Sequence, residues 1–183
     1  MKIRIVGACG SGKTTLARTL SQTYDVPYYE LDNLTWDRSE EPNRRRAVEE
    51  RDRLLREIVS TDTWIVEGAQ HTWGRESLEL ADVILILQPH RLLRDFRVIR
   101  RFVRTRLGLE ASPYRQKLSD LIQMLRVWNR DYDREGYATV MELTAHRAHK
   151  RAVVSDQVEA LAYVEAYQCE QTKQRGVDQD GKP

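Results

Sequence analysis

The chain is poor in cysteine, has no long apolar run and has almost no net charge, and each shortage excludes a class of protein. Two cysteines, Cys9 and Cys169, are too few for a disulfide framework or a cysteine-based metal site. The longest strongly apolar run, Val83 to Leu87, is far below the roughly 20 residues that a membrane-spanning helix needs. A net charge of +2 is not that of a general nucleic-acid-binding protein. We expect a soluble cytoplasmic protein with no signal peptide and no membrane partner.

The length and composition predict one domain. A chain of 183 residues can bury one core, predicted over residues 1–171, and its polar end, residues 172–183, is expected to be disordered. The four histidines form no ligand set. His146 and His149 lie three residues apart without a third partner, so a surface position explains them better than a metal site.

Short β-branched or apolar segments alternate with helical patterns along the chain. Such alternation is typical of a three-layer α/β fold, in which helices cover a parallel sheet. Five segments are predicted as strands, and they begin at Lys2, Val26, Thr63, Asp82 and Arg151.

Five helices are predicted between and after these strands. Their expected ranges are 12–23, 44–60, 91–108, a segment that opens at Ser112 and Pro113, and 156–168. In the third helix an apolar stripe is surrounded by arginines, and its members are Leu92, Phe96, Ile99 and Val103. The fourth helix is expected to carry on one face Leu118, Leu121, Leu125, Trp128 and Tyr132.

The segment "GACGSGKT" lies between the first predicted strand and the first predicted helix. It satisfies the pattern G-x-x-x-x-G-K-[ST] in the structural context that this pattern requires. Small residues let backbone N–H groups surround a phosphate, and the following helix dipole adds attraction. An ordinary strand-to-helix turn is the weaker alternative. The sequence therefore predicts an ATP site, formed by Gly7, Ala8, Cys9, Gly10, Ser11, Gly12, Lys13, Thr14 and Thr15.

The rest of the chain narrows the class of phosphate-loop protein. A switch GTPase would need a base-reading N-K-x-D segment, and a transporter-type ATPase would need a longer chain with a signature loop; the sequence has neither. A small phosphoryl-transfer kinase fits, with Lys13 on the β- and γ-phosphates. The alternative is a P-loop ATPase that acts as a nucleic-acid-binding regulator, because arginines are dense near residue 100.

Several segments resemble one family of small kinases. "GACGSGKTTLARTL", "ELDNLTW", "WIVEGAQ" and "RVIRR" are similar to the adenylate-kinase-related P-loop kinases known as DNA topology modulation proteins. The resemblance covers residues 1–106 and returns weakly at Trp128 and at "VVSDQVEAL". It implies a nucleoside monophosphate kinase-like fold with a five-stranded parallel sheet and a helical lid over about residues 91–136. It also implies ATP, Mg²⁺ and a small acceptor, most simply a nucleoside monophosphate or nucleoside.

The acceptor and the metal are expected at the carboxyl ends of the second and third strands, where ligands bind in parallel sheets. By the resemblance, Asp32 orients or deprotonates the acceptor hydroxyl, with Glu30 as the alternative. The competing structural explanation is that the side chain of Asp32 only caps the next turn. Thr14 and Glu67 are expected on Mg²⁺, although relatives have an aspartate in place of Glu67. Further acceptor contacts are predicted for Trp36, Gly68 and Arg75.

The arginines of the third helix are expected to stabilise the transferring group. Phosphoryl transfer spreads negative charge over oxygens that a guanidinium fork can bind. Arg97 and Arg101 match "RVIRR" best and are the predicted catalytic arginines. Solvation or ion pairing explains Arg100 and Arg104 better. The acceptor's identity, the choice of ATP or GTP and the oligomeric state, monomer or homodimer, stay open.

Overall fold

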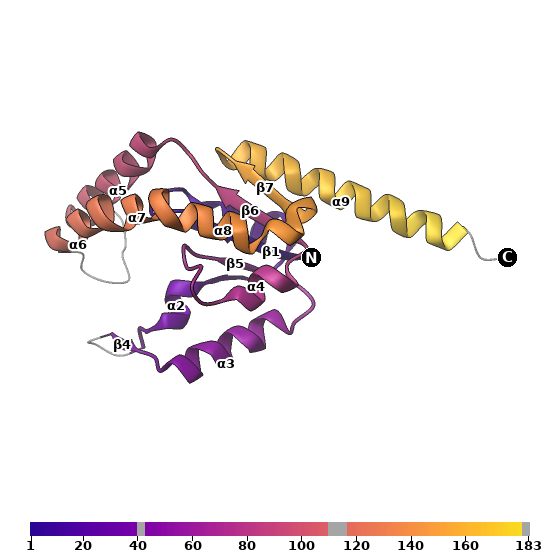
Figure 1. Cartoon of the computed structure of the whole chain (residues 1–183), viewed down its shortest axis with the longest axis horizontal. Helices are drawn as coiled ribbons and strands as arrows, with labels where there is room; N and C mark the ends of the chain where they lie inside the picture. Colours follow the sequence, from indigo (N-terminus) through magenta and orange to yellow (C-terminus); the bar gives the residue numbers. More distant parts are fainter. Residues whose placement is uncertain (40–42, 110–116, 181–183) are drawn as a thin grey trace.

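The structure is a computed structural model that describes residues 1–39, 43–109 and 117–180 (Figure 1). Its centre is a five-stranded parallel sheet in the order β2-β5-β1-β6-β7. The predicted α/β fold with five parallel strands is confirmed. The strands are β1 (Lys2–Val6), β2 (Tyr28–Glu30), β5 (Trp64–Glu67), β6 (Val83–Leu87) and β7 (Arg151–Val154).

Helices cover both faces of this sheet and enclose one core on each side. Leu16 and Leu20 of α1 (Lys13–Tyr24) pack on one face with Val164 of α9 (Gln157–Asp180). The other face is covered mainly by α3 (Val48–Val59), α4 (Arg75–Leu80) and α8 (Tyr137–Leu143). Three layers result.

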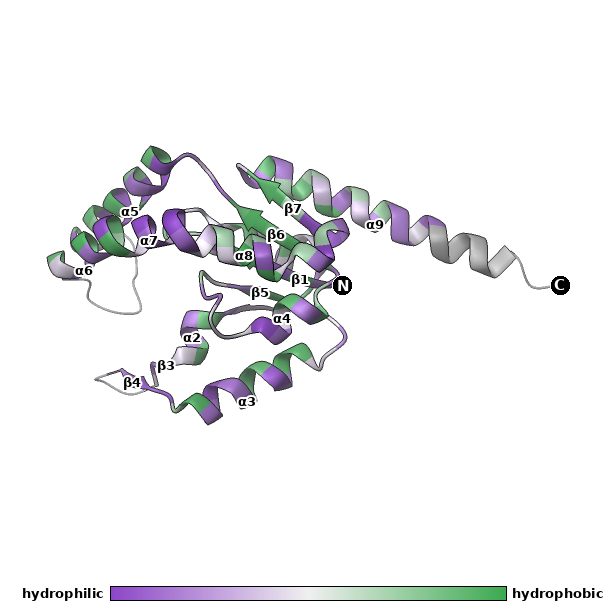
Figure 2. Ribbon diagram, in the orientation of Figure 1, coloured by the Kyte–Doolittle hydropathy of each residue, from purple (hydrophilic) through white to green (hydrophobic). Residues whose placement is uncertain are grey.

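The central strands are apolar throughout because both of their faces are buried. All five residues of β6 are fully buried, and Figure 2 shows this strand as hydrophobic. Successive strand side chains point to opposite faces. Ile84 and Ile86 accordingly join one core, while Val83, Leu85 and Leu87 join the other. This pattern is typical of a parallel sheet between helical layers.

The strand order brings three carboxyl ends together. β1 lies between β5 and β6, and β2 pairs with β5, so the ends of β2, β5 and β1 are neighbours. Glu30 and Glu67 are paired positions at the ends of β2 and β5. The loop after Val6 starts beside them. The fold thus places the phosphate loop and two acidic strand ends at one edge of the sheet.

The second predicted helix starts later than expected. The range 44–60 is wrong at its beginning, because Arg44 and Arg45 form strand β4 (Arg44–Arg45), which pairs with β3 (Trp36–Asp37). Arg46 holds this hairpin, since its guanidinium donates to the Trp36 carbonyl at 3.0 Å and lies 3.4 Å from the Asp37 carboxylate. A short helix, α2 (Leu31–Thr35), connects β2 to β3.

The fourth predicted helix is interrupted by π-helical turns. Its expected start at Ser112 and Pro113 lies outside the described residues, and the described part begins with α6 (Leu118–Gln123). The chain continues through η1 (Met124–Trp128), α7 (Asn129–Asp131) and η2 (Tyr132–Gly136), of which η1 and η2 are π-helical.

The expected apolar face of this segment is therefore wrong in part. A π turn bonds i to i+5 and shifts the register of all later side chains. From the first π turn onward, Trp128 is exposed and Asn129 is fully buried, while Tyr132 is buried as expected. Before these turns, Leu121 is buried as expected and Leu118, the first residue of α6, is exposed.

Two further helices differ from expectation. The stripe of α5 (Arg91–Arg106) faces solvent, although an apolar stripe ordinarily faces the core. α9 continues to Asp180, well past the end predicted near residue 168, because no proline interrupts it. A disordered tail over residues 172–183 stays a prediction, and residues 181–183 lie outside the described part. The 3-10 helix η3 (Ala145–Lys150) carries both predicted surface histidines, which are exposed.

Candidate functional site

The phosphate loop needs glycine at two positions for two reasons. Gly10 and Gly12 have φ values of 75° and 101°, a backbone region that side chains disfavour. A Cβ at Gly10 would also lie 2.4 Å from the backbone oxygen of Arg94 on α5. Gly10 therefore permits close contact between the loop and α5.

Replacing Gly10 by alanine is expected to reduce ATP affinity about tenfold or more, because relief of the backbone clash must displace the loop. Gly108 is the matched control, since it has a similar φ of 70° but open space where its Cβ would be. Titration calorimetry with ATP and Mg²⁺ checks this. Equal affinities of the Gly10→Ala and Gly108→Ala variants would show that the contact with α5 is unimportant.

Lys13 and Thr14 begin α1 at the end of the loop. The Lys13 Nζ donates to the Ala8 carbonyl at 2.9 Å, so the ammonium lies across the loop. The Thr14 hydroxyl donates to a Glu67 carboxylate oxygen at 2.5 Å. A hydroxyl beside a carboxylate is a pair of hard oxygen ligands of the kind Mg²⁺ prefers. These two residues therefore fit the predicted metal role.

Three carboxylates gather near the loop, two at neighbouring strand ends and one in the helix that follows β2. Glu67 is buried at the end of β5 with Glu30 beside it on β2. Burial, and next the charge of Glu67, raises the pKa of Glu30 above its ordinary value. Asp32 lies in the first turn of α2, exposed rather than capping it with its side chain. Its Oδ1 accepts a 2.5 Å hydrogen bond from the Gln70 Nε2, a contact that sequence reasoning missed.

A fully buried arginine holds the backbone that follows β5 at this acidic edge of the sheet, which is the edge formed by Glu30, Asp32 and Glu67. Arg4 is on β1, and its guanidinium donates to the carbonyls of Gly68 at 3.2 Å and Gln70 at 3.0 Å. Burial lowers the pKa of Arg4 to about 10, while the charge of Glu67 opposes that shift. Arg4 thus holds the turn that carries Glu67 and Gln70. Its signal in the sequence was a charged residue between the apolar residues Ile3 and Ile5 of "KIRIVG".

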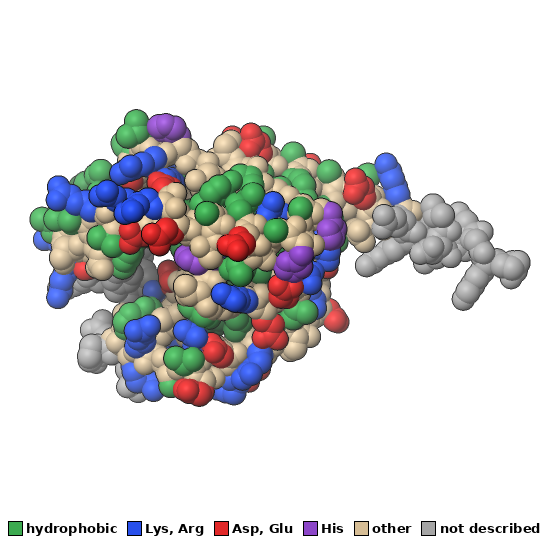
Figure 3. Space-filling model, in the orientation of Figure 1, with side chains coloured by type: hydrophobic (Ala, Val, Ile, Leu, Met, Phe, Trp, Pro, Cys, Tyr) green, Lys and Arg blue, Asp and Glu red, His purple; other side chains and the backbone are tan. Residues whose placement is uncertain are grey.

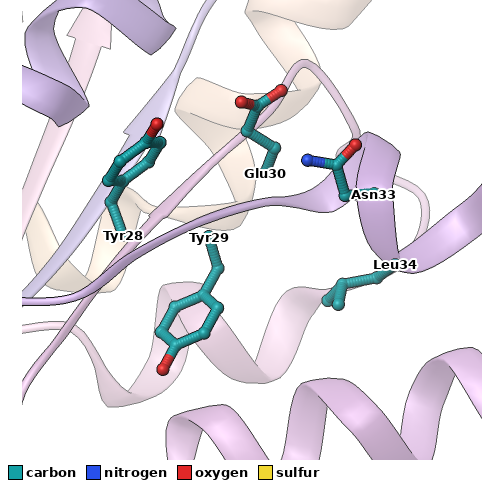
Figure 4. A pocket seen from close by; sticks show the side chains of 5 residues that line it. All are labelled: Tyr28, Tyr29, Glu30, Asn33 and Leu34. Carbon is teal, nitrogen blue, oxygen red and sulfur yellow. The ribbon is translucent and has the colours of Figure 1, made fainter. Parts of the chain in front are cut away.

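One of the predicted acceptor residues, Glu30, lines a cavity at this edge of the sheet. A cavity of about 300 Å³ lies along β2 and the start of α2, lined by Tyr28, Tyr29, Glu30, Asn33 and Leu34. Figure 4 shows Tyr28 and Tyr29 on opposite sides of β2, with the amide of Asn33 turned toward Glu30.

Trp36 and Arg75 are not part of that cavity lining, although the backbone N–H of Trp36 donates to the carbonyl of Asp32 at the end of α2. Trp36 begins β3 and is 40% exposed, and Arg75 is exposed at the start of α4. Gly68, in contrast, follows Glu67 directly and lies close to Leu31 of α2. Acceptor contacts of all three residues stay predictions.

Arg97 approaches the phosphate loop from α5. Its Nη1 donates to the Ser11 carbonyl at 3.0 Å. A second cavity, about 260 Å³, opens beside it and is lined by Ser11, Gly12, Thr15, Arg97, Asp156 and Gln157. Arg101, one turn later, turns toward Met124 of the adjoining helices, with 3.9 Å between its Nη2 and the Met124 Sδ. Of the two predicted arginines, Arg97 therefore hydrogen-bonds to the loop, while Arg101 lies close enough to Cys9 of the loop for its charge to act on that thiol.

Arg94 has a structural role that sequence reasoning missed. It is 1% exposed, and its Nη2 donates to both carboxylate oxygens of Asp133, at 2.7 and 2.6 Å. Its backbone oxygen is the atom that crowds Gly10. Arg94 thus joins the loop to η2. Nothing in the sequence spacing distinguished it from the neighbouring arginines.

Cys9 packs into the small cluster formed by Val98, Leu121 and Met124. Burial raises the pKa of its thiol, and nearby Lys13 and Arg101 only partly oppose that effect. A raised pKa keeps the thiol protonated and unreactive at neutral pH. This agrees with a packing residue at a variable loop position rather than a reactive thiol.

The comparisons with known proteins concern this same region. Residues 3–97 match a family model described as an AAA domain. The chain belongs to this AAA domain family. A search of the curated proteins finds no match. The structure is similar to that of shikimate kinase from Bacteroides thetaiotaomicron, with 17% identity and a TM-score of 0.44 over 86% of this chain and 87% of that chain.

The matched part of this AAA domain runs from β1 to Arg97 and contains the P-loop, Asp32 and Glu67. The P-loop domain implies nucleotide binding. Membership of the narrower DNA topology modulation group stays a prediction. None of the helices in the described part of the chain combines the length and apolar character that a bilayer crossing requires.

Proposed function

We propose that this AAA domain protein is an ATP-dependent kinase that transfers a phosphoryl group to a small hydroxylated acceptor. The observation that carries the proposal is the placement of two kinds of group on opposite sides of one P-loop. Arg97 and the second cavity lie on one side. On the other side, Glu67 and Glu30 end neighbouring strands and Asp32 lies in the first turn of the helix that follows β2. An ATP whose phosphates follow the loop would have room for its base in that cavity and its terminal phosphate toward the acidic edge.

Each group then has a defined task. Lys13 and the loop amides bind the triphosphate, while Thr14 and Glu67 supply the oxygen ligands for Mg²⁺, which neutralises phosphate charge when bound. Asp32 accepts the proton of the acceptor hydroxyl, and Gln70 holds the carboxylate in place. Arg97, and Arg101 after a rearrangement toward the loop, stabilise the transferring group. Catalysis is positioning and electrostatics.

The nucleic-acid-binding alternative gains little from the arginines of α5. Arg94 is buried in an ion pair, Arg97 is bonded to the loop, and Arg101 faces Met124. The ion pair withdraws Arg94 from any phosphate backbone, and the contact of Arg97 with the loop favours a nucleotide role for that residue, although the side chains of Arg97 and Arg101 are both exposed. These contacts favour the kinase.

A panel of acceptors tests the proposal. Nucleoside monophosphates, nucleosides and small hydroxylated metabolites are each added to protein with ATP and Mg²⁺, and ADP release is measured. One acceptor class should raise release well above the basal rate. Salt-resistant retention on duplex DNA without any acceptor stimulation would instead establish the regulator.

Asp32→Asn is expected to lower kcat by about 10²- to 10⁴-fold while ATP affinity stays nearly unchanged, because the amide keeps the shape but cannot take a proton. The readouts are steady-state turnover with the stimulating acceptor and ATP calorimetry. Asp62→Asn, an exposed change in the turn before β5, is the matched control. A wild-type kcat in the Asp32→Asn variant would remove Asp32 from the acceptor role.

A further inference from the structure

The outer face of α5 carries a continuous apolar stripe that stays exposed among the described residues of the chain. The side chains are 43% to 71% exposed, and they belong to Leu92, Phe96, Ile99, Val103 and Leu107. Successive helical residues are about 100° apart, so their spacing of four, three, four and four places all five within one narrow arc. Scattered exposed apolar residues are ordinary, but a contiguous stripe of five marks an interaction surface.

This exposure is not the result of an undocked helix. The opposite face of α5 is firmly buried, with Arg94 and Val98 each 1% exposed. Val98 packs with Leu121 and Met124, and Arg94 is held by Asp133. The helix therefore packs on the fold through its inward face and presents the stripe as a second, outward face.

Positive charge borders the stripe. α5 contains seven arginines and one acidic residue in 16 residues, while the whole chain has a net charge of +2. The rest of the chain is therefore net negative, and the basic excess is local. Helical geometry places Arg100 and Arg104 along one border of the stripe. It places Arg106 and Arg91, which forms an ion pair with Asp95, along the other border.

The stripe is a ridge rather than a groove. The two cavities beside the phosphate loop and β2 include no stripe residue. α5 lies at the end of the molecule away from the C-terminus, where Figure 3 shows apolar and basic side chains intermingled (Figures 1 and 3). A partner helix would need a groove to be enclosed. A lipid surface accepts a ridge, because apolar side chains enter it from above.

We propose that the outer face of α5 docks this protein on an anionic lipid bilayer. The stripe reaches the acyl boundary, and the bordering arginines remain at the level of the phosphates with their aliphatic stems buried. A second copy is disfavoured, because two such helices would bring their arginines together. Duplex DNA satisfies arginines but offers no apolar surface of this size. The expectation of no membrane partner rested on the absence of a spanning segment, and the peripheral contact proposed here needs no such segment.

Vesicle co-sedimentation of the full chain tests this proposal. Vesicles of phosphatidylcholine mixed with phosphatidylglycerol are compared with phosphatidylcholine alone, at low and high ionic strength. Retention is expected on the anionic vesicles and should weaken with salt. The double variant Phe96→Ser/Ile99→Ser and the charge reversal Arg100→Glu should each reduce it about tenfold or more. Val158→Ser, which alters a 74% exposed residue of α9, should change nothing.

Three results would overturn the proposal. The first is no retention on anionic vesicles at low ionic strength. The second is retention that the double variant leaves intact, which would place the lipid contact elsewhere. The third is a homodimer in light scattering that the double variant dissociates, which would assign the stripe to a second copy. Circular dichroism and thermal melting are expected to be unchanged in the double variant, since both side chains are exposed.

Discussion

Lys13→Ala is expected to lower kcat/KM for phosphoryl transfer by about 10²- to 10³-fold or more. The ammonium is the cation at the closed end of the loop, and loss of one preorganised donor to developing negative charge costs this much in other enzymes. It lies against the Ala8 carbonyl at 2.9 Å, so its removal leaves the backbone of the loop intact. Initial rates of ADP release with the stimulating acceptor measure the effect.

The matched control is Lys173→Ala, which removes an exposed lysine of α9 and should leave the rate unchanged. Circular dichroism and thermal melting confirm that the Lys13→Ala variant is folded. Calorimetry with ATP separates the two parts of the proposal. Full transfer activity in the Lys13→Ala variant would contradict the nucleotide site itself. If the wild-type protein binds ATP but no acceptor of the panel stimulates ADP release, only the kinase activity is contradicted.

Asp133→Ala is expected to lower the free energy of unfolding by about 3 kcal/mol. The carboxylate is the partner of Arg94, whose side chain is almost fully buried, and removal of one member of such a pair leaves an uncompensated charge in the interior. The carboxylate of Asp133 itself is 26% exposed, so the effect should fall at the lower end of the range for buried pairs. Urea unfolding followed by circular dichroism gives the measurement.

Asp131→Ala serves as the matched control, because Asp131 is exposed two residues earlier in the same helical segment. Its unfolding free energy should stay within about 0.5 kcal/mol of wild type. The Asp133→Ala variant should also bind ATP less tightly, since Arg94 contacts Gly10 through its backbone. Equal stability of the two variants would show that water replaces the Asp133 carboxylate at no cost.

The fold was largely predictable because its signals are local. Each parallel strand between two helical layers is buried on both faces and therefore appears in the sequence as an apolar run, as in "DVILILQP". The phosphate loop was predictable for a similar reason. Its glycines, lysine and threonine are consecutive, so their chemistry is contained in one segment.

The sequence did not predict those parts of the fold in which strand pairing or helical register determines where a residue lies. Arg44 and Arg45 follow a helical pattern but pair with Trp36 and Asp37, which lie elsewhere along the chain. The π-helical turns after α6 shift side chains by a fraction of a turn, so Trp128 faces solvent and Asn129 is buried. Periodicity in a sequence cannot show such a shift, because it assumes a constant helical repeat.

The sequence alone determined the α/β class, the phosphate loop and the acidic residues that end the second and third predicted strands. Only the tertiary structure decided the strand order, the support of the acidic edge by Arg4, the pairing of Gln70 with Asp32 and the separate directions of Arg94, Arg97 and Arg101. The physical reason is the range of the interactions. Backbone conformation and apolar periodicity are set by neighbours in sequence, whereas each of these contacts joins residues far apart in the chain, and identical arginines differ only in what the fold places beside them.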